Sequence, residues 1–225
     1  MNALMLLKTD HRTVEALFKQ FEKLGDGSAS KKKQLVQKII KELSVHASIE
    51  EQVFYPAVRK TVKKAEDDVL EALEEHHIVK WVLSELDGMS PDAERFDAKV
   101  TVLMENVRHH VKEEEQDLFP EVKKKMAAQE LATLGTLMEK AKLLAPTRPH
   151  PRAPDAPPGN IVVGAGAMML DKARDAAAGV MKRMTGNGGR STKSQNGPAS
   201  ARRGRTGRAN AEAGARAQSE TSHRR

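Results

Sequence analysis

The sequence contains an internal repeat in which histidine and glutamate recur within apolar helical patterns. A shift of 65 residues superposes "DHRTVEALFKQFE" on "EHHIVKWVLSELD", and a shift of 64 superposes "HASIEEQVFYPAV" on "HVKEEEQDLFPEV". The superposition pairs His11 with His76, His46 with His110, and Glu50 with Glu114. The repeat predicts two helix pairs of one design, each with a histidine on its first helix and His-x-x-x-Glu on its second.

The fold class follows from the spacing of apolar residues in the first 145 residues, which recur three and four positions apart. The chain is 39% apolar but only 3% aromatic, which suits a bundle built on Leu, Val, Ile, Met and Ala. Four long helices with short connections predict an all-α, up-down-up-down four-helix bundle. Asp10 is read as the N-cap of the first helix, and "AAQELATLGTLMEKAKLLA" predicts an extra C-terminal helix.

The chain divides into two regions of different charge. Residues 146–225 contain 15 Lys and Arg against 5 Asp and Glu, which gives this region a net charge of +10. Residues 1–145 have a net charge of −3, so the whole chain has a net charge of +7. A Pro-rich linker opens the second region, and its Gly, Ser and Arg-rich end predicts a disordered basic tail. A short amphipathic helix is expected between them, from Ala167 to Met184. We therefore predict a bundle domain at 1–145 and a linker with a tail at 146–225.

Several classes of protein are excluded by what the sequence lacks. The 225 residues contain no cysteine, which excludes disulfides, thiolate zinc sites and a cysteine nucleophile. The sequence contains no run of about 18 apolar residues, so no membrane span is predicted. The first residues do not resemble a signal peptide. The expected location is the cytoplasm.

The His-x-x-x-Glu spacing points to metal binding. Positions i and i+4 lie on one face of a helix, so His46 and Glu50 face a common centre, as do His110 and Glu114. In an antiparallel bundle four imidazoles and two carboxylates then converge, and burying them without a partner costs several kcal/mol. Two metal ions offset this cost, with the glutamates as candidate bridges. An imidazole-rich set with carboxylates suits iron, and also zinc, copper or manganese.

Neighbouring residues offer competing assignments. His77 competes with His76, and His109 with His110, but only His76 and His110 keep the spacing of the first copy to its apolar and glutamate positions. Glu51 and its counterpart Glu115 lie about 100° round the helix and are expected to face solvent or pair with Lys or Arg. Tyr55 and Phe119 are interpreted as core packing, and the prolines after them as ends or kinks of their helices.

The motifs "DHRTVEALFKQFE", "HASIEEQVFYP", "EHHIVKWVLSEL" and "HHVKEEEQDLFP" together resemble the hemerythrin family, in particular bacterial proteins with the His-His-Glu cation-binding domain. The resemblance covers about residues 3–145 and implies a non-haem di-iron centre with two iron ions, bridged by carboxylates and an oxo or hydroxo group. It implies that this centre binds O2 reversibly or reacts with related oxidants. The ligands implied at matching positions are His11, His46, Glu50, His76, His110 and Glu114.

The sequence departs from the oxygen-carrying members of that family at two positions. Lys80 stands where those carriers have a further histidine, and Glu114 follows His110 by four residues where they have an aspartate at five. The resemblance then implies that one iron lacks a protein ligand, with water, hydroxide or Glu115 in its place. This favours reaction or sensing over oxygen carriage.

Three functions compete at this point. The leading hypothesis is a di-iron module that binds or senses O2, nitric oxide or peroxide. The second is a di-iron peroxidase or catalase-like enzyme. The third is an interaction protein whose basic tail binds nucleic acid or an anionic surface without sequence specificity.

Overall fold

The computed structural model describes residues 1–25, 27–153, 167–176 and 179. Most of these residues are helical, and turns and loops connect the helices. No strand occurs among these residues, which confirms the all-α prediction. The elements are α1 (Ala3–Glu22), α2 (Ala29–Ile49), η1 (Glu50–Phe54), α3 (Tyr55–Thr61), η2 (Lys63–Ala65), α4 (Glu66–Gly88), α5 (Phe96–Glu113), η3 (Glu114–Leu118), α6 (Phe119–Lys125) and α7 (Ala128–Lys142).

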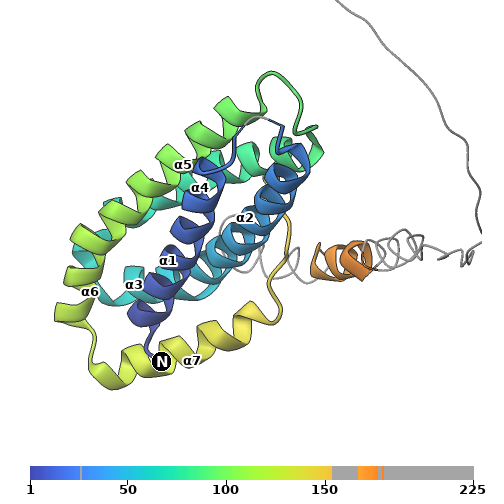
Figure 1. Cartoon of the computed structure of the whole chain (residues 1–225). Coiled ribbons are helices and arrows are strands. Elements are labelled where there is room, and N and C mark those ends of the chain that lie inside the picture. Colours follow the sequence, from blue (N-terminus) through green and yellow to red (C-terminus); the bar gives the residue numbers. More distant parts are fainter. Residues whose placement is uncertain (26, 154–166, 177–178, 180–225) are drawn as a thin grey trace, which may run out of the picture. The chain divides into compact units, whose positions relative to one another are not determined.

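Four long rods make the bundle. They are α1, the continuous run from α2 to α3, α4, and the continuous run from α5 to α6, and neighbouring rods run in opposite directions (Figure 1). Helix α7 then crosses beside the start of α1 (Figure 1). This arrangement confirms the up-down-up-down bundle with an extra C-terminal helix.

Helix α1 begins seven residues before the predicted N-cap. The side chain of Asn2 caps it, because Asn2 Oδ1 accepts a hydrogen bond from the Met5 N–H at 2.9 Å. The added turns bury Leu6 and Leu7 against the end of the bundle that α7 covers, and this burial favours continuing the helix. The assignment of Asp10 as N-cap was therefore wrong, and its carboxylate is free for another role.

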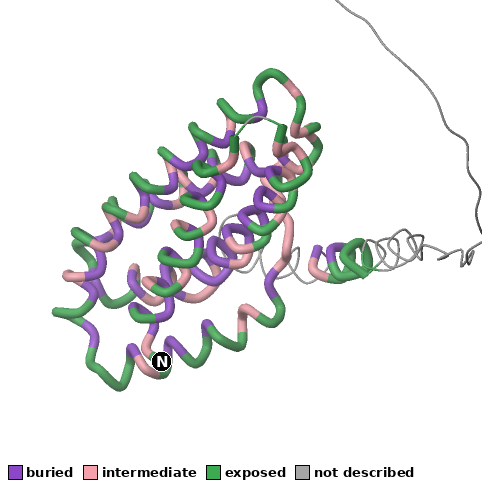
Figure 2. Tube along the Cα trace, in the orientation of Figure 1, coloured by how far each residue is buried: buried purple, intermediate pink, exposed green. Residues whose placement is uncertain are grey.

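Two apolar clusters occupy the two ends of the bundle interior. One gathers residues such as Leu7, Ile49 and Val69 with the inner face of α7, and the other gathers residues such as Val14 and Leu83. Figure 2 shows the buried positions along the sides of the helices that face one another. On every rod the histidine predicted to bind metal lies between residues of the two clusters, so the polar centre is enclosed by apolar layers on both sides.

A π-helical turn interrupts each of the two longest rods where the repeat places its glutamate. In the first, the Tyr55 N–H donates to the carbonyl of Glu50, five residues earlier, and in the second Phe119 does the same to Glu114. The turn adds a residue just before the proline, whose nitrogen cannot donate to the helix. The rods continue beyond the prolines to Thr61 and Lys125, so the prolines do not end these helices.

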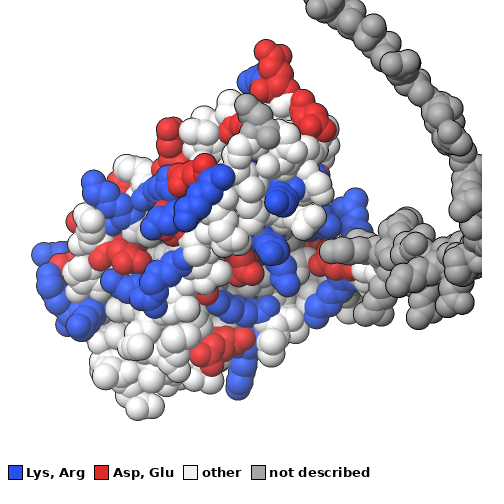
Figure 3. All heavy atoms as spheres, viewed as in Figure 1, with Lys and Arg blue, Asp and Glu red and all other residues white. Residues whose placement is uncertain are grey.

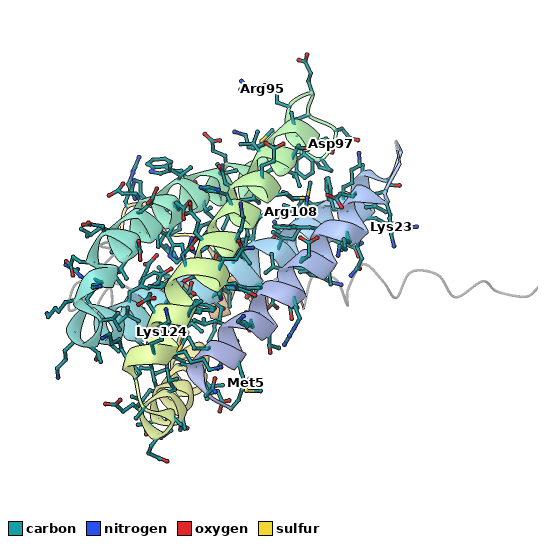
Figure 4. All side chains as sticks on the ribbon, turned by 90° about the vertical axis from the view of Figure 1, so that its left-hand side faces the viewer. Met5, Lys23, Arg95, Asp97, Arg108 and Lys124 are labelled. Carbon is teal, nitrogen blue, oxygen red and sulfur yellow. The ribbon has the colours of Figure 1, made fainter. Side chains whose placement is uncertain are left out.

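Ion pairs join rods that are distant in sequence. Arg108 on α5 pairs with Glu15 at 2.9 Å and with Glu22 at 2.9 Å, both on α1, and Figure 4 shows Arg108 on α5 beside α1. After α7, the Arg148 guanidinium contacts Asp87 of α4 at 2.7 Å. The N–H groups of Thr147 and Arg148 each donate to Asp171 at 3.0 Å.

Several sequence predictions fall largely outside the described residues. These include the disordered tail and its contact with nucleic acid, most of the Pro-rich linker, and most of the second half of the helix expected at 167–184. They stay predictions, as does the domain boundary at residue 145. Within that expected helix, the described residues 167–176 and 179 are helical. Of the helices that are described, none has the length and apolar character to span a bilayer.

The contact of α7 with the N-terminus gives a test of the fold. A Cβ on Gly135 of α7 would lie 2.3 Å from the Met1 carbonyl oxygen and 2.8 Å from the Ala3 nitrogen. Gly135→Ala is therefore expected to lower the free energy of unfolding by about 1–3 kcal/mol, although this change inside a helix normally raises it by up to about 1 kcal/mol.

Gly88→Ala at the end of α4 is the matched control, because its Cβ would meet open space among the described residues. Urea unfolding of both variants measures the difference. A Gly135→Ala protein as stable as the wild type would contradict the close approach of α7 to the N-terminus.

Candidate metal centre

Six side chains with ligand-type atoms meet in the middle of the bundle. They are His11 of α1, His46 and Glu50 where α2 meets η1, His76 of α4, and His110 and Glu114 where α5 meets η3. Each is at most 5% exposed. The structure thus brings together all six residues that the sequence predicts as metal ligands.

The imidazole Nε2 atoms point inward toward the two glutamates. The distances from Nε2 to carboxylate Oε2 are 3.1 Å for His46–Glu50, 3.4 Å for His76–Glu50, 3.3 Å for His11–Glu114 and 3.7 Å for His110–Glu114. The Nε2 atoms of His76 and His110 are 3.2 Å apart. Each glutamate therefore faces one histidine from its own rod and one from another rod.

The cluster divides into two sets of ligand-type atoms that share one residue. His11, His46, Glu50 and Glu114 form a set whose ligand atoms lie within 4.8 Å of one another, and Glu50, His76 and His110 form a second set by the same measure. A carboxylate that belongs to both sets is placed where it would bridge two metal ions. The second set has one protein residue fewer than the first.

Five of the inward atoms lack hydrogen-bond partners among the described residues. This holds for Nε2 of His11 and His46, for both oxygens of Glu50, and for Oε2 of Glu114. An unsatisfied buried polar atom costs about 1–3 kcal/mol, and more when it is charged. Cations bound by these lone pairs offset that cost, so the residues present fit a metal centre.

Every histidine also has a carboxylate facing the Nδ1 atom on its outer side. His11 Nδ1 lies 2.9 Å from Glu115, His76 Nδ1 lies 3.0 Å from Glu51, His110 Nδ1 lies 2.7 Å from Glu75, and His46 Nδ1 lies 3.6 Å from Asp10. The three carboxylates within 3.0 Å accept from Nδ1–H, which fixes the ring and leaves the lone pair of Nε2 directed inward. Asp10 lies beyond hydrogen-bond distance of His46. The histidines are thereby oriented for ligation from outside the cluster.

These four carboxylates follow the repeat. Asp10 and Glu75 each precede a histidine, and Glu51 and Glu115 each follow a ligand glutamate. Each orients a histidine on another rod, which a pattern within one helix cannot reveal. The local sequence pattern predicts this role for none of them. The recurrence of the acidic residues in both copies of the repeat is the feature of the sequence that indicates it.

Lysines back three of the four carboxylates. Lys80 Nζ lies 3.0 Å from Glu51, Lys8 Nζ lies 3.2 Å from Glu115, and Lys142 Nζ lies 2.5 Å from Asp10. The expectation that Glu51 pairs with a basic residue holds, but Glu51 is 6% exposed and does not face solvent. Lys80 stands at the position where oxygen carriers of the resembled family have a further histidine. Its ammonium group pairs with Glu51, which in turn contacts His76 Nδ1.

Tyr55 has a polar role that its interpretation as core packing missed. Its buried hydroxyl donates to Glu114 Oε1 at 3.0 Å and lies 3.5 Å from His76 Nε2. Phe119, its counterpart in the repeat, stacks on the ring of His11 with centroids 6.0 Å apart. The two copies therefore differ, because only one of them places a hydroxyl in the cluster.

The competing histidines lie away from the cluster. His77 accepts from the Trp81 indole N–H at 3.1 Å, and the His109 side chain is 60% exposed beside Glu113. This placement agrees with the prediction of His76 and His110 as ligands from their spacing to apolar and glutamate positions in the repeat.

Burial and mutual charge set the protonation of the cluster. Burial lowers the pKa of His46 to about 4. Burial, and then the negative charge of Glu114, raise the pKa of Glu50 well above its ordinary value. Burial also raises the pKa of Glu114, but the positive charge on His110 and the contacts with His11 outweigh it, so that the pKa falls below its ordinary value. The two carboxylates do not tolerate both charges without added positive charge.

Fold and centre together define the class of the protein. It is an antiparallel helical bundle with a buried cluster of histidines and glutamates that fits a metal centre.

The chain belongs to the hemerythrin HHE cation-binding domain family, whose model matches residues 2–122. An uncharacterized hemerythrin-like protein of Schizosaccharomyces pombe is 30% identical over 167 residues, which cover 74% of this chain and 81% of that protein. A protein named DNA nickase from Nostoc is 30% identical over 142 residues, which cover 63% of this chain but 39% of that protein. The crystal structure of a hemerythrin HHE cation binding domain-containing protein of Mycobacterium kansasii superposes with a TM-score of 0.53 at 26% identity, covering 63% of this chain and 88% of that one.

Replacing an outer carboxylate tests whether it orients its histidine. Glu115→Gln is expected to weaken metal binding about 10- to 100-fold with little change in stability, because its lysine partner Lys8 is 40% exposed. Glu51→Gln is expected to weaken binding similarly and also to lower the free energy of unfolding by at least about 1 kcal/mol, because it removes a partner of the buried Lys80.

Chelator competition measures the metal affinity and urea unfolding measures the stability. Glu105→Gln, an exposed change on α5, serves as the control. Wild-type affinity in both Glu115→Gln and Glu51→Gln would contradict the orienting role.

Proposed function

We propose that the chain holds a non-haem di-iron centre at His11, His46, Glu50, His76, His110 and Glu114, and uses it to bind or sense O2, nitric oxide or peroxide. The observation that carries the proposal is the convergence of inward ligand atoms that have no hydrogen-bond partner among the described residues. A core that needed no cation would be more stable with apolar side chains at these positions.

The donor set supports iron as the metal. Four imidazoles and two carboxylates offer nitrogen and oxygen but no thiolate, a combination that suits iron and also manganese or zinc. The Nδ1 carboxylates raise the basicity of the imidazoles, which strengthens their binding to a cation. When bound, the iron pair supplies redox-active sites at which a small oxidant binds or is reduced.

A small apolar cavity beside the histidines supports a ligand of two or three atoms. It has a volume of about 20 Å³ and is lined by the four histidines together with Val14, Leu43, Ala47, Val79, Val107 and Val111. A cavity needs about 10–15 Å³ to hold one water, so this one admits a single molecule of that size. Its valine-rich wall leaves no room for larger ligands.

Tyr55 holds a proton at the centre. Burial, and then the charge of Glu114, raise the pKa of its hydroxyl well above the ordinary value, so Tyr55 stays protonated. Its O–H is directed at Glu114 Oε1 at 3.0 Å. This fixes the carboxylate and keeps a hydrogen-bond donor close to His76.

Metal content is the experiment that tests this function. Protein reconstituted anaerobically with ferrous iron and freed of excess metal is expected to retain two irons per chain. His46→Ala is expected to lose at least one of them, because it removes a ligand from the set that contains Glu50. His77→Ala, at a half-buried histidine outside the cluster, is the matched control and should retain two.

Metal analysis with the visible absorption spectrum provides the measurement. Fewer than one iron per chain in the wild type, or equal loss in His46→Ala and His77→Ala, would contradict a di-iron centre at these residues.

A second candidate, a di-iron enzyme that destroys peroxide, is favoured by the smaller of the two ligand sets. Glu50, His76 and His110 offer three protein ligands against four on the other side, and Lys80 pairs with Glu51 where carriers have a histidine. Missing protein ligands leave positions at which a substrate can bind.

Steady-state peroxide consumption separates the two candidates. The enzyme predicts many turnovers per chain, reduced more by Lys80→His, which supplies the histidine that the carriers have, than by Lys80→Gln. The binding module predicts a spectral change at about one ligand per centre and no turnover. Equal turnover in the two variants would remove Lys80 from the explanation.

A further inference from the structure

A second, more open cavity reaches the metal centre from the surface. It has a volume of about 150 Å³ and lies between α4 and the α5–η3 rod. Its carboxylate lining consists of Asp68, Glu71, Glu75, Glu113, Glu114 and Asp117, with His110, and no lysine or arginine is among the described residues that line it. Elsewhere the sign of the surface alternates, as on the face in Figure 3, where basic and acidic side chains are interspersed.

The inner wall of this acidic cavity is part of the proposed metal centre. Glu114 is 2% exposed, lines the cavity, and keeps Oε2 without a hydrogen-bond partner among the described residues. His110, beside it, belongs to the ligand set with fewer protein residues. The cavity therefore reaches one residue of each ligand set.

A further donor set borders the cavity, because two of its three residues, Glu75 and Glu113, also line the cavity. Glu75, His109 and Glu113 bring one ligand atom each within 4.8 Å of one another, with His109 Nε2 at 3.1 Å from Glu113 and 3.7 Å from Glu75. The second oxygen of Glu75 lies 2.7 Å from His110 Nδ1. One carboxylate thus connects the outer donors with a histidine of the buried centre.

Glu75 also differs from the other three carboxylates that orient histidines. Asp10, Glu51 and Glu115 are each paired with a lysine, whereas the described partners of Glu75 are His109 and His110. A lysine at this point would repel an approaching cation.

The other copy of the repeat shows that the acidic wall is not required by the bundle. At the shifts of 65 and 64 the positions of Asp68, Glu71, Glu113 and Asp117 correspond to Ala3, Leu6, Ile49 and Val53. These four apolar residues belong to the core that α7 covers, and the first three are at most 1% exposed. One copy is thus sealed by apolar packing, while the same position in the other is open and lined with carboxylates.

We propose that this cavity is the uptake route of the metal centre: a vestibule that attracts a divalent transition-metal cation from solution, holds it at Glu75, His109 and Glu113, and passes it to His110 and Glu114. The volume of about 150 Å³ is many times the roughly 10–15 Å³ that a cavity needs to hold one water, so it has room for a partly hydrated ion. Mixed imidazole and carboxylate donors select such cations over Ca²⁺ and Mg²⁺. The proposal rests on the di-iron function proposed above.

The test measures how fast the metal-free full-length protein takes up Co²⁺, followed by the visible absorption of the bound ion in a stopped-flow instrument. Glu71→Gln/Glu113→Gln/Asp117→Asn removes three charges from the vestibule and leaves the six buried residues and Glu75 unchanged. Electrostatic focusing raises association rates by about 10- to 1,000-fold, so this variant is expected to load about tenfold more slowly at low salt. It should still bind two Co²⁺ per chain at equilibrium.

The matched control is Asp92→Asn/Glu94→Gln/Glu105→Gln, which makes the same change in net charge at exposed positions outside the vestibule. It should load at the wild-type rate. Added salt should slow the wild type and the control much more than the vestibule variant. His109→Ala should also load more slowly, because it removes the nitrogen donor of the outer set.

The outcomes separate this inference from the function on which it rests. Equal loading rates in the vestibule variant, the control and His109→Ala, with two ions bound in each, would overturn the uptake route and leave the metal centre intact. Failure of the wild type to bind Co²⁺ at equilibrium would overturn the metal centre and the uptake route together.

Discussion

The structure depends on the burial of four imidazoles and two carboxylates between two apolar layers. Charged and polar groups of this kind are stable in a protein interior only when each has a partner. The outer Nδ1 atoms of His76, His110 and His11 have theirs in Glu51, Glu75 and Glu115, whereas the inner atoms face one another. The bundle holds these inner atoms in place from outside, and the proposed cations would be the partners that complete them.

The two copies of the repeat have become unequal around this centre. Helix α7 seals the end that contains Leu6 and Ile49, and the corresponding region of the other copy is open and acidic. Tyr55 donates to Glu114, while Phe119 has no hydroxyl to offer Glu50. The positions that the two copies share supply the six ligand-type residues. The positions at which the copies differ supply the acidic cavity beside His110 and Glu114, and the Tyr55 hydroxyl that donates to Glu114.

Much of this could be predicted from the sequence, because the ligand pattern is local. A histidine and a glutamate four residues apart share a helix face whatever surrounds them, and the repeat selected His76 over His77 and His110 over His109. The bundle followed from apolar spacing and short connections. The outer carboxylates could not be found in this way, because each contacts a histidine on another rod. Glu51, which an α-helix puts about 100° from Glu50, was expected to face solvent or pair with Lys or Arg. It pairs with Lys80, but inside the bundle and beside His76, because α4 packs against this rod. Asp10 resembled an N-cap because the burial of Leu6 and Leu7 against the region that α7 covers is not visible in the local pattern.

The central claim is that two metal ions bind between the copies and share Glu50. Anomalous X-ray diffraction from crystals of the iron-loaded protein tests it most directly, since it locates the iron independently of the protein atoms. The account predicts two iron peaks inside the bundle, one beside His11 and His46 and the other beside His76 and His110, with Glu50 touching both. A single peak, or two peaks that do not share Glu50, would contradict it.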